Sequence, residues 1–477
     1  MDTVFDLDKY MMTFITELEK GNQPFILGFG YPAHVCKATF EKNEKDNFVL
    51  KFDLPEGGGP VHEYFFTRPA VLSVPKHLNV FLRNTDAIRV SETISATPKI
   101  EIEYQSFTTE IDSEKWKNSK HCAYYKYKKK DFQYIYFSLQ YSITTSKNQK
   151  SEWKNAFVIN ISGKNVLVSF DESIKGEDAY CIFRAQEPMD IVLFEKIIEA
   201  IMVSIGLFAG YYFADRAYYV SNYSTKESQD RMDLIFRYKN LSKPLKQHYP
   251  LLDRLRYKDI EIQELQITEE QFNKLVKLLV EREEYLRTMR LLFDASTIEG
   301  PSRGVLAVVA LETVSNLMKD KDSPAKIVAD KSLANKMTYE LKKVLKNVIK
   351  EEVSEKDYEK LVTKAEGLNN LPNAVKLESA FEKNGITLNE DDLFCINCRN
   401  CFLHGGLPKS NKLYFLTEQE LVFVVSQRLI MLTSMLLLKK VGYSGLVNDW
   451  GYTNISKRRA ISEGQLIIHQ GNAHRRV

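Results

Sequence analysis

A large excess of charge of either sign is absent from this chain of 477 residues. Its 66 lysines and arginines are nearly balanced by 63 aspartates and glutamates, which leaves a net charge of +3. Proteins that coat nucleic acids through their overall charge carry a far larger excess of basic residues. A histone-like binder is therefore excluded, and any surface that binds a polyanion must be local.

Cysteine is scarce, and its placement does not indicate disulfides. The six cysteines lie at Cys36, Cys122, Cys181, Cys395, Cys398 and Cys401. No secretory leader precedes them, so we expect a reducing, cytoplasmic setting. The last three are spaced Cys-x-x-Cys-x-x-Cys, but steps of three residues along a helix move about 60° around its axis each time. We therefore expect small buried thiols rather than a metal or cofactor site.

Familiar nucleotide-binding and hydrolase motifs are missing from the N-terminal half. Its glycine-rich segment at 56–60 lacks the Lys-Ser/Thr ending of a phosphate-binding loop, and no Gly-x-Ser-x-Gly segment occurs there. The most apolar stretch of the chain, 191–213, is interrupted by Glu195, Lys196 and Glu199. The uncharged run is too short for a membrane span, so the stretch predicts a buried helix and no membrane partner.

The hydrophobic pattern changes period between the two halves of the chain. Short alternating segments between about residues 22 and 187 predict antiparallel strands, preceded by a helix at about 4–20. After Pro188 the spacing becomes that of helices. The fold class expected is α+β and multidomain. It comprises a β-rich, sandwich-like domain at 1–187, a hydrophobic helix and connector at 188–239, an all-α helical bundle at 240–445 and a C-terminal tail at 446–477.

Apolar residues at a period of about 3.6 place the helices of the second half. We expect them at about 269–293, 303–318, 332–349, 355–364, 393–404 and 417–440. The lysine- and glutamate-rich segment between 319 and 390 is expected to add further helices and a basic rim. The tail beyond Trp450 is expected to be a flexible end with solvated charges.

The tract from Cys395 to Gly406 carries the most specific chemistry in the chain. It places Arg399, Asn400 and His404 at the spacing Arg-Asn-x-x-x-His, on a helix that is expected to stop at Gly405. Histidine exchanges protons near neutral pH, and arginine offers a charged planar fork to phosphate oxygens. These are the groups needed to cleave RNA through its own 2′-hydroxyl without a metal, so the tract indicates metal-independent RNA cleavage.

The geometry of a helix limits how these residues can meet. Asn400 lies one turn before His404, whereas Arg399 lies about 140° away from His404 around the axis. Arg399 must therefore curl back, or two helices must face each other across a dimer axis. A structural alternative remains open, in which Arg399 pairs with Asp391 or Asp392 and His404 caps the end of its helix.

The Arg-Asn-x-x-x-His tract on a late helix of an all-α domain resembles the HEPN ribonucleases. A β-rich half before such a domain resembles the ApeA-type HEPN proteins of bacterial anti-phage, abortive-infection defence. The resemblance implies an endoribonuclease toxin without cofactor, whose HEPN domain at 240–445 forms a homodimer with the catalytic residues Arg399, Asn400 and His404 at the interface. It places Glu312 beside the cleft, although a solvated carboxylate is an open alternative.

The resemblance also implies partners for both halves. The substrate would be tRNA or another cellular RNA, and the N-terminal domain would sense a phage-derived trigger and restrain the nuclease. Two other interpretations remain open. The helical half could be a non-catalytic dimer that binds RNA or a nucleotide, and the β-rich half could be an enzyme or a carbohydrate-binding domain.

Overall fold

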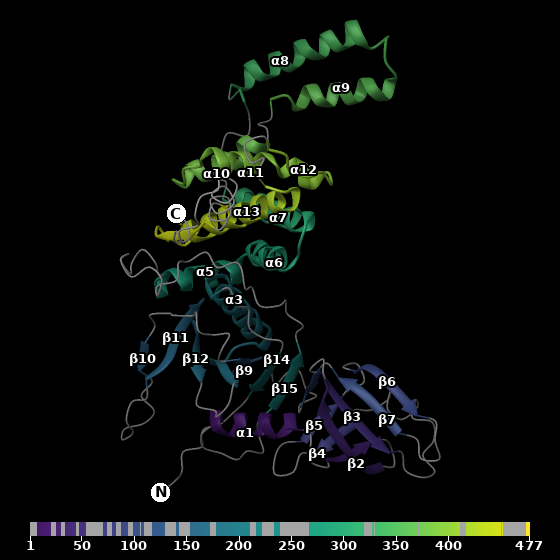
Figure 1. The fold of residues 1–477 in the computed structure, drawn as a ribbon, viewed down its shortest axis with the longest axis vertical. Coiled ribbons are helices and arrows are strands. Elements are labelled where there is room, and N and C mark those ends of the chain that lie inside the picture. The colour runs from purple at the N-terminus through teal and green to yellow at the C-terminus, as the bar shows by residue number, and fades with distance from the viewer. Residues whose placement is uncertain are drawn as a thin grey trace. The chain divides into compact units, whose positions relative to one another are not determined.

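A computed structural model gives the fold of the chain (Figure 1). The residues it describes are 7–20, 25–29, 34–43, 47–53, 70–73, 79–82, 87–93, 99–104, 106–108, 117–128, 140–142, 153–171, 178–209, 216–221, 233–238, 267–318, 327–328, 330–369, 373–410, 416–449, 451 and 474–477. The chain divides into two compact units, Met1–Lys246 and Gln247–Val477. The β-rich first half and helical second half expected from the sequence are both present.

The described residues of the first unit form two helices and a large antiparallel sheet. The helices are α1 (Leu7–Lys20) and α3 (Ile191–Ala209). The strands are β1 (Phe25–Phe29), β2 (His34–Lys42), β3 (Phe48–Asp53), β4 (Ala70–Ser73), β5 (Asn79–Leu82), β6 (Ala87–Thr93), β7 (Lys99–Tyr104), β8 (Ser106–Thr108), β9 (His121–Lys128), β10 (Gln140–Ser142), β11 (Trp153–Ile161), β12 (Lys164–Asp171), β13 (Asp178–Ala185), β14 (Arg216–Ser221) and β15 (Asp233–Tyr238).

Alternation of apolar and polar residues explains why these segments form strands. In β3, Phe48, Leu50 and Phe52 are buried, while the residues between them are partly or fully exposed. Hydrogen bonds join the described strands in one sheet of order β10-β11-β12-β13-β9-β14-β15-β8-β5-β4-β1-β2-β3-β7-β6. The antiparallel strands expected from the sequence are therefore present. The sequence also favours a strand at 132–141, whose end lies in β10, while 132–139 lie outside the described residues.

Helix α1 is attached to the sheet by a carboxylate that is almost buried. Glu19 forms ion pairs with Lys42 of β2 and Lys126 of β9, and it accepts a hydrogen bond from the hydroxyl of Tyr218 in β14. Burial alone would raise the pKa of Glu19, but the two ammonium groups outweigh it and lower that pKa. One carboxylate thus joins α1 to three strands.

The residues expected to be a connector belong to this unit as well. Strand β14 pairs with both β9 and β15, and β15 pairs with β8. Phe194 of α3 lies against the rings of His121 and Tyr219, whose centroids are 5.3 and 6.5 Å away. The expected domain limit at 187 therefore needs correction, because α3, β14 and β15 complete the first unit. Residues 216–221 and 233–238 are thus strands of the sheet and not a linker.

The second unit is built mainly from helices. They are α5 (Glu269–Glu281), α6 (Glu283–Thr297), α7 (Pro301–Leu317), α8 (Lys331–Val344), α9 (Glu355–Gly367), α10 (Asn373–Lys383), α11 (Glu390–Asn397), α12 (Arg399–Leu403) and α13 (Glu418–Lys440), with a π-helical turn, η5 (Leu345–Ile349), after α8. The helix expected at 269–293 is two helices, because Arg282 adopts an extended conformation between α5 and α6.

Helix α13 is the centre of this unit. Most of its residues are buried, and it packs along α7 and α11. It is the one described helix long and apolar enough to cross a membrane, but 94% of the relevant window is buried inside the protein. A core helix passes such a test as readily as a membrane span does. Helix α3, the most apolar stretch by sequence, does not pass it.

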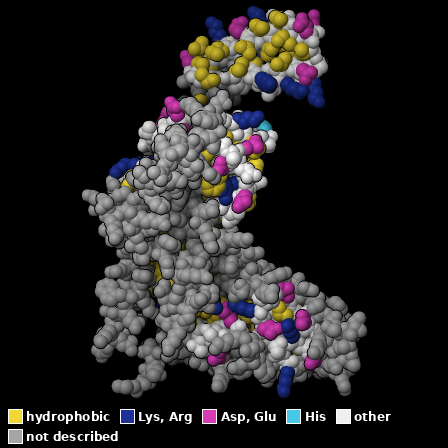
Figure 2. Space-filling view, viewed as in Figure 1, with side chains coloured by type: hydrophobic (Ala, Val, Ile, Leu, Met, Phe, Trp, Pro, Cys, Tyr) yellow, Lys and Arg dark blue, Asp and Glu magenta, His cyan; other side chains and the backbone are white. Residues whose placement is uncertain are grey.

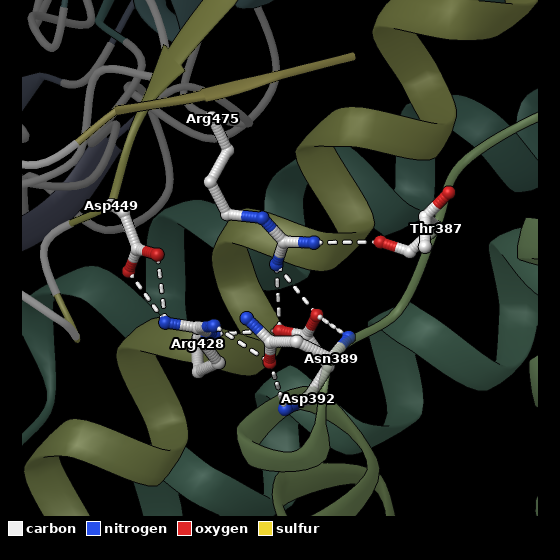
Figure 3. Close-up of polar contacts among 6 residues, drawn as sticks. All are labelled: Thr387, Asn389, Asp392, Arg428, Asp449 and Arg475. Carbon is white, nitrogen blue, oxygen red and sulfur yellow. Dashed lines mark hydrogen bonds and ion pairs between the residues drawn. The ribbon is translucent and has the colours of Figure 1, made fainter.

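A buried network of charged side chains joins α11, α13 and the end of the chain (Figure 3). Arg428 in α13 donates from Nε to Asp392 Oδ1 at 2.6 Å and from Nη1 to Asp449 Oδ2 at 2.7 Å. The side chains of Arg428 and Asp392 are only 2% and 0% exposed. Burial alone would lower the pKa of Arg428, but the carboxylates of Asp449 and Asp392 outweigh it and raise that pKa.

The C-terminal residues complete the network. Arg475 donates from Nη1 to both carboxylate oxygens of Asp392, at 2.8 and 2.6 Å, and from Nη2 to the Thr387 carbonyl. Its strand β17 (His474–Arg476) pairs with β16 (Leu446–Asn448). The flexible, solvated end expected beyond Trp450 therefore needs correction at residues 474–477, since they pack on the helical unit. The basic segment 457–459 lies outside the described residues.

Removing Arg428 should destabilise the helical unit strongly. Arg428→Met leaves the Asp449 carboxylate buried without its guanidinium, and breaking one side of a buried ion pair costs about 3–5 kcal/mol. We expect a lower Tm when thermal unfolding of the full chain is followed by helical circular dichroism. Lys274→Met is the matched control, because it removes an exposed ion pair with Glu270 and should cost less than about 1 kcal/mol. Equal effects of the two changes would contradict a structural role for the network.

Candidate functional site

The Arg-Asn-x-x-x-His tract lies on two short helices in close succession. Helix α11 begins with a capping box, in which Asn389 and Asp392 each accept a hydrogen bond from the other's backbone N–H. It ends at Asn397 with Cys398 as its C-cap residue, and α12 follows with Arg399 as its first residue. The single helix expected over 393–404 is therefore interrupted once, directly before the tract. The first turn of α11 carries the carboxylates of Glu390, Asp391 and Asp392.

A Schellman motif ends α12 at the position expected from the sequence. The N–H of Gly406 donates to the Cys401 carbonyl at 2.7 Å, and the N–H of Gly405 donates to the Phe402 carbonyl at 3.2 Å. Gly405 has a φ of 73°, which favours glycine because a side chain is strained there. His404 is consequently the C-cap residue, and its side chain is exposed.

Close packing between Gly304 and Phe402 holds α12 against α7. A Cβ at Gly304 would lie 2.4 Å from the Phe402 ring, so only a glycine accommodates this ring position. Gly304 closes the sequence Gly-Pro-Ser-Arg-Gly at 300–304. Here that sequence begins a helix that follows another helix, unlike the strand-to-helix turn of a serine hydrolase. Gly304 therefore has a packing role, because its contact with Phe402 holds α7 beside the tract.

Arg399, Asn400 and Glu312 meet in one cluster. Asn400 Oδ1 accepts hydrogen bonds from Arg399 Nε at 3.2 Å and from its Nη2 at 2.9 Å. Glu312 Oε1 of α7 lies 3.3 Å from Arg399 Nε. The side chains of Arg399 and Glu312 are 11% and 33% exposed. Arg399 Nη1 is buried and has no hydrogen-bond partner among the described groups, so one donor of the fork is unused.

The structure separates the remaining alternatives for Arg399 and His404. Arg399 turns toward Glu312, while Asp392 is taken by Arg428 and Arg475. The carboxylate beside Arg399 is therefore Glu312 and not the Asp391 or Asp392 of the structural alternative, whereas His404 does lie at the end of its helix as that alternative expected. In the described part of the chain, no hydrogen bond or ion pair joins the His404 imidazole to the Arg399 cluster. One copy thus gathers Glu312, Arg399 and Asn400 and leaves His404 in solvent at the helix end.

The cysteines of the tract contribute packing. Cys395 and Cys398 are buried, and burial raises the pKa of both thiols, that of Cys398 to about 12. A thiol with so high a pKa is protonated near neutral pH and is a poor nucleophile or metal ligand. These residues behave as the small buried side chains that the helical spacing predicts.

One histidine of the first unit could have been a candidate for chemistry in that half. His121 is fully buried, with Nδ1 bonded to the Ser221 hydroxyl and Nε2 2.8 Å from the Met189 carbonyl. Both ring nitrogens are therefore occupied by protein groups that join β9, β14 and the start of α3. This arrangement fits a structural role within the sheet.

Sequence reasoning missed the residues that support the tract. Arg428, Asp449 and Arg475 fix the first turn of α11, and Gly304 fixes the distance to α7. One signal was visible in the sequence. Arg428 stands in the middle of an otherwise apolar helix, where an arginine needs a carboxylate partner.

Comparisons with protein-family models, with curated proteins and with solved structures gave no match. The function of the tract must therefore be argued from the geometry above and from the chemistry of its residues.

The contact between Gly304 and Phe402 can be tested by a double-mutant cycle. In the wild type, Gly304→Ala forces the new methyl group into the Phe402 ring, and overpacking of this kind costs about 1–3 kcal/mol. In a Phe402→Leu background the clash is relieved, so the same change should be neutral or stabilising, because alanine favours helix by about 1 kcal/mol over glycine. The measurement is the free energy of unfolding for the four proteins. A stabilising Gly304→Ala in both backgrounds would contradict the close packing.

Proposed function

We propose that the chain is a metal-independent HEPN endoribonuclease that acts in anti-phage, abortive-infection defence. Arg399, Asn400 and His404 would form its catalytic site, with Glu312 positioning Arg399. The observation that carries the proposal is the Arg399 guanidinium. Asn400 and Glu312 orient it, one N–H remains unused, and the exposed His404 lies one turn beyond Asn400.

The chemistry assigns a separate task to each side chain. An imidazole of His404 removes the proton of a ribose 2′-hydroxyl or protonates the departing 5′-oxygen. The 2′-oxygen forms a bond to the adjacent phosphorus as the bond to the 5′-oxygen breaks, which leaves a 2′,3′-cyclic phosphate and a 5′-hydroxyl. The positive charge of the Arg399 guanidinium stabilises the negative charge that develops on the phosphate oxygens. Asn400 orients the guanidinium for this contact.

A second copy of the chain would complete the site. His404 and Arg399 lie on different sides of α12, and Arg399 faces Glu312 within its own copy. Two α12 helices facing each other across a two-fold axis would add the histidine of one copy to the arginine of the other. In this proposal the helical unit dimerises, the first unit senses a phage-derived trigger, and the substrate is tRNA or another cellular RNA.

A different observation supports a non-catalytic alternative. The Glu312 carboxylate lies against the Arg399 guanidinium, whose side chain is only 11% exposed. An arginine neutralised in this way attracts a phosphate less strongly. A helical dimer that binds RNA or a nucleotide without cleaving it would tolerate this pairing. Loss of RNA binding in Arg399→Ala, with no cleavage by the wild type, would favour this alternative.

Cleavage assays with three variants test the catalytic proposal. His404→Ala should lower the rate of RNA cleavage by about 10²–10⁴-fold, the usual contribution of a positioned acid or base. Arg399→Ala should lower it by about 10²–10³-fold through loss of charge stabilisation. Lys409→Ala is the matched control, since it removes an exposed cation shortly after the tract and should leave the rate unchanged.

The same assay is repeated with EDTA, which should not change the rate. If His404→Ala cleaves as fast as the wild type, or if EDTA abolishes cleavage, the proposed mechanism is wrong.

A further inference from the structure

Helices α8 and α9 form a hairpin (Figure 1), and their sequences differ in charge. The segment 331–350, which contains α8 and η5, has six lysines and a single acidic residue, Glu340. Helix α9, by contrast, has four acidic residues and three lysines. The ends of the hairpin are joined at its base, where Asn369 accepts a hydrogen bond from the Val328 N–H at 2.7 Å and donates one to its carbonyl at 3.2 Å. Basic charge is thus concentrated on α8.

Three of the α8 and η5 lysines follow one another along the helix with a tyrosine between them. Lys336, Tyr339, Lys343 and Lys346 are spaced three, four and three residues apart, and all four side chains are exposed. This spacing keeps Lys336, Tyr339 and Lys343 on one face of α8. Tyr339 is 66% exposed. Figure 2 shows lysines and hydrophobic side chains at the surface of this hairpin.

These three lysines have no ion-pair partner among the described residues. Lys342 pairs with Glu366 of α9, and the ammonium of Lys350 lies 5.7 Å from the centre of the Tyr358 ring. No carboxylate of the described residues forms an ion pair with Lys336, Lys343 or Lys346. Glu340 is the one carboxylate that this segment places near Lys336 and Lys343, so the face keeps a net positive charge that is available to a polyanion.

We propose that Lys336, Tyr339, Lys343 and Lys346 form an RNA-binding face. The lysines contact successive phosphates, and the Tyr339 ring stacks on a base. The face spans about 15 Å at a rise of about 1.5 Å per residue, which matches four or so stacked nucleotides at about 3.4 Å each. This inference rests on the proposed function only in taking RNA as the substrate class. It adds an RNA-binding surface that lies outside the Arg-Asn-x-x-x-His tract.

The tyrosine favours RNA over an acidic protein as the partner. An exposed aromatic ring between lysines provides a stacking surface for an unpaired base, in addition to electrostatic attraction. An acidic polypeptide would use the lysines but would gain little from the ring. Single-stranded RNA is therefore the ligand that uses both features of the face.

The test measures binding of a fluorescent single-stranded RNA to the full chain by anisotropy at several salt concentrations. The protein carries His404→Ala so that the RNA stays intact. Lys336→Gln/Lys343→Gln/Lys346→Gln should weaken binding about tenfold or more at low salt and lower the slope of log K against log [salt] by about 2. The matched control is Lys356→Gln/Lys360→Gln/Lys364→Gln, which removes three exposed lysines from α9 of the same hairpin.

Tyr339 is tested separately. Tyr339→Ala should weaken binding about fivefold or more, and Tyr339→Phe should not, because the ring that stacks is retained. The inference is overturned if the α8 and α9 triple variants have equal effects on RNA binding, or if neither weakens it. It is also overturned if the His404→Ala protein binds no RNA, or if polyglutamate of equal charge competes as well as RNA does. None of these binding results depends on cleavage, so the catalytic proposal is tested separately by the RNA cleavage assay.

Discussion

The helical unit depends on the buried pairing of Arg428 with Asp392 and Asp449. Arginine and carboxylate groups lose much of their hydration when buried, so each is stable there only while its partners are in place. Asp392 also accepts from Arg475 and caps the first turn of α11. A single carboxylate therefore joins the core helix α13, the strand pair β16–β17 and the helix that leads into the Arg-Asn-x-x-x-His tract.

Two further contacts fix the position of the tract within the helical unit. The Phe402 ring packs on the bare backbone of Gly304, which fixes α12 beside α7. Glu312, two turns further along α7, then reaches Arg399. Arg399 is oriented by neighbours on two helices, while His404 stands at a helix end that Gly405 terminates. A rigid arginine and an exposed histidine suit a site that is completed by a second copy and by RNA.

Local pattern was enough to predict much of this arrangement. The periods of two and 3.6 residues separated the β-rich and helical halves, and Gly405 marked the end of the tract helix. Long-range pairing was beyond such reasoning. The sequence did not indicate that Arg475 would return from the tail to Asp392, or that β14 would pair with β9 across almost a hundred residues. Glu312 was placed beside the cleft by resemblance, and its contact with Arg399 is a feature of the structure.

The chemistry of RNA ends tests the central claim most directly. RNA from cells that express the wild-type chain and from cells that express His404→Ala is sequenced by a method that distinguishes 2′,3′-cyclic phosphates from 3′-hydroxyls. The account predicts new ends with 2′,3′-cyclic phosphates and 5′-hydroxyls in the wild type only, because the 2′-oxygen is the nucleophile. New ends with 3′-hydroxyls and 5′-phosphates, or the same new ends in both samples, would contradict it.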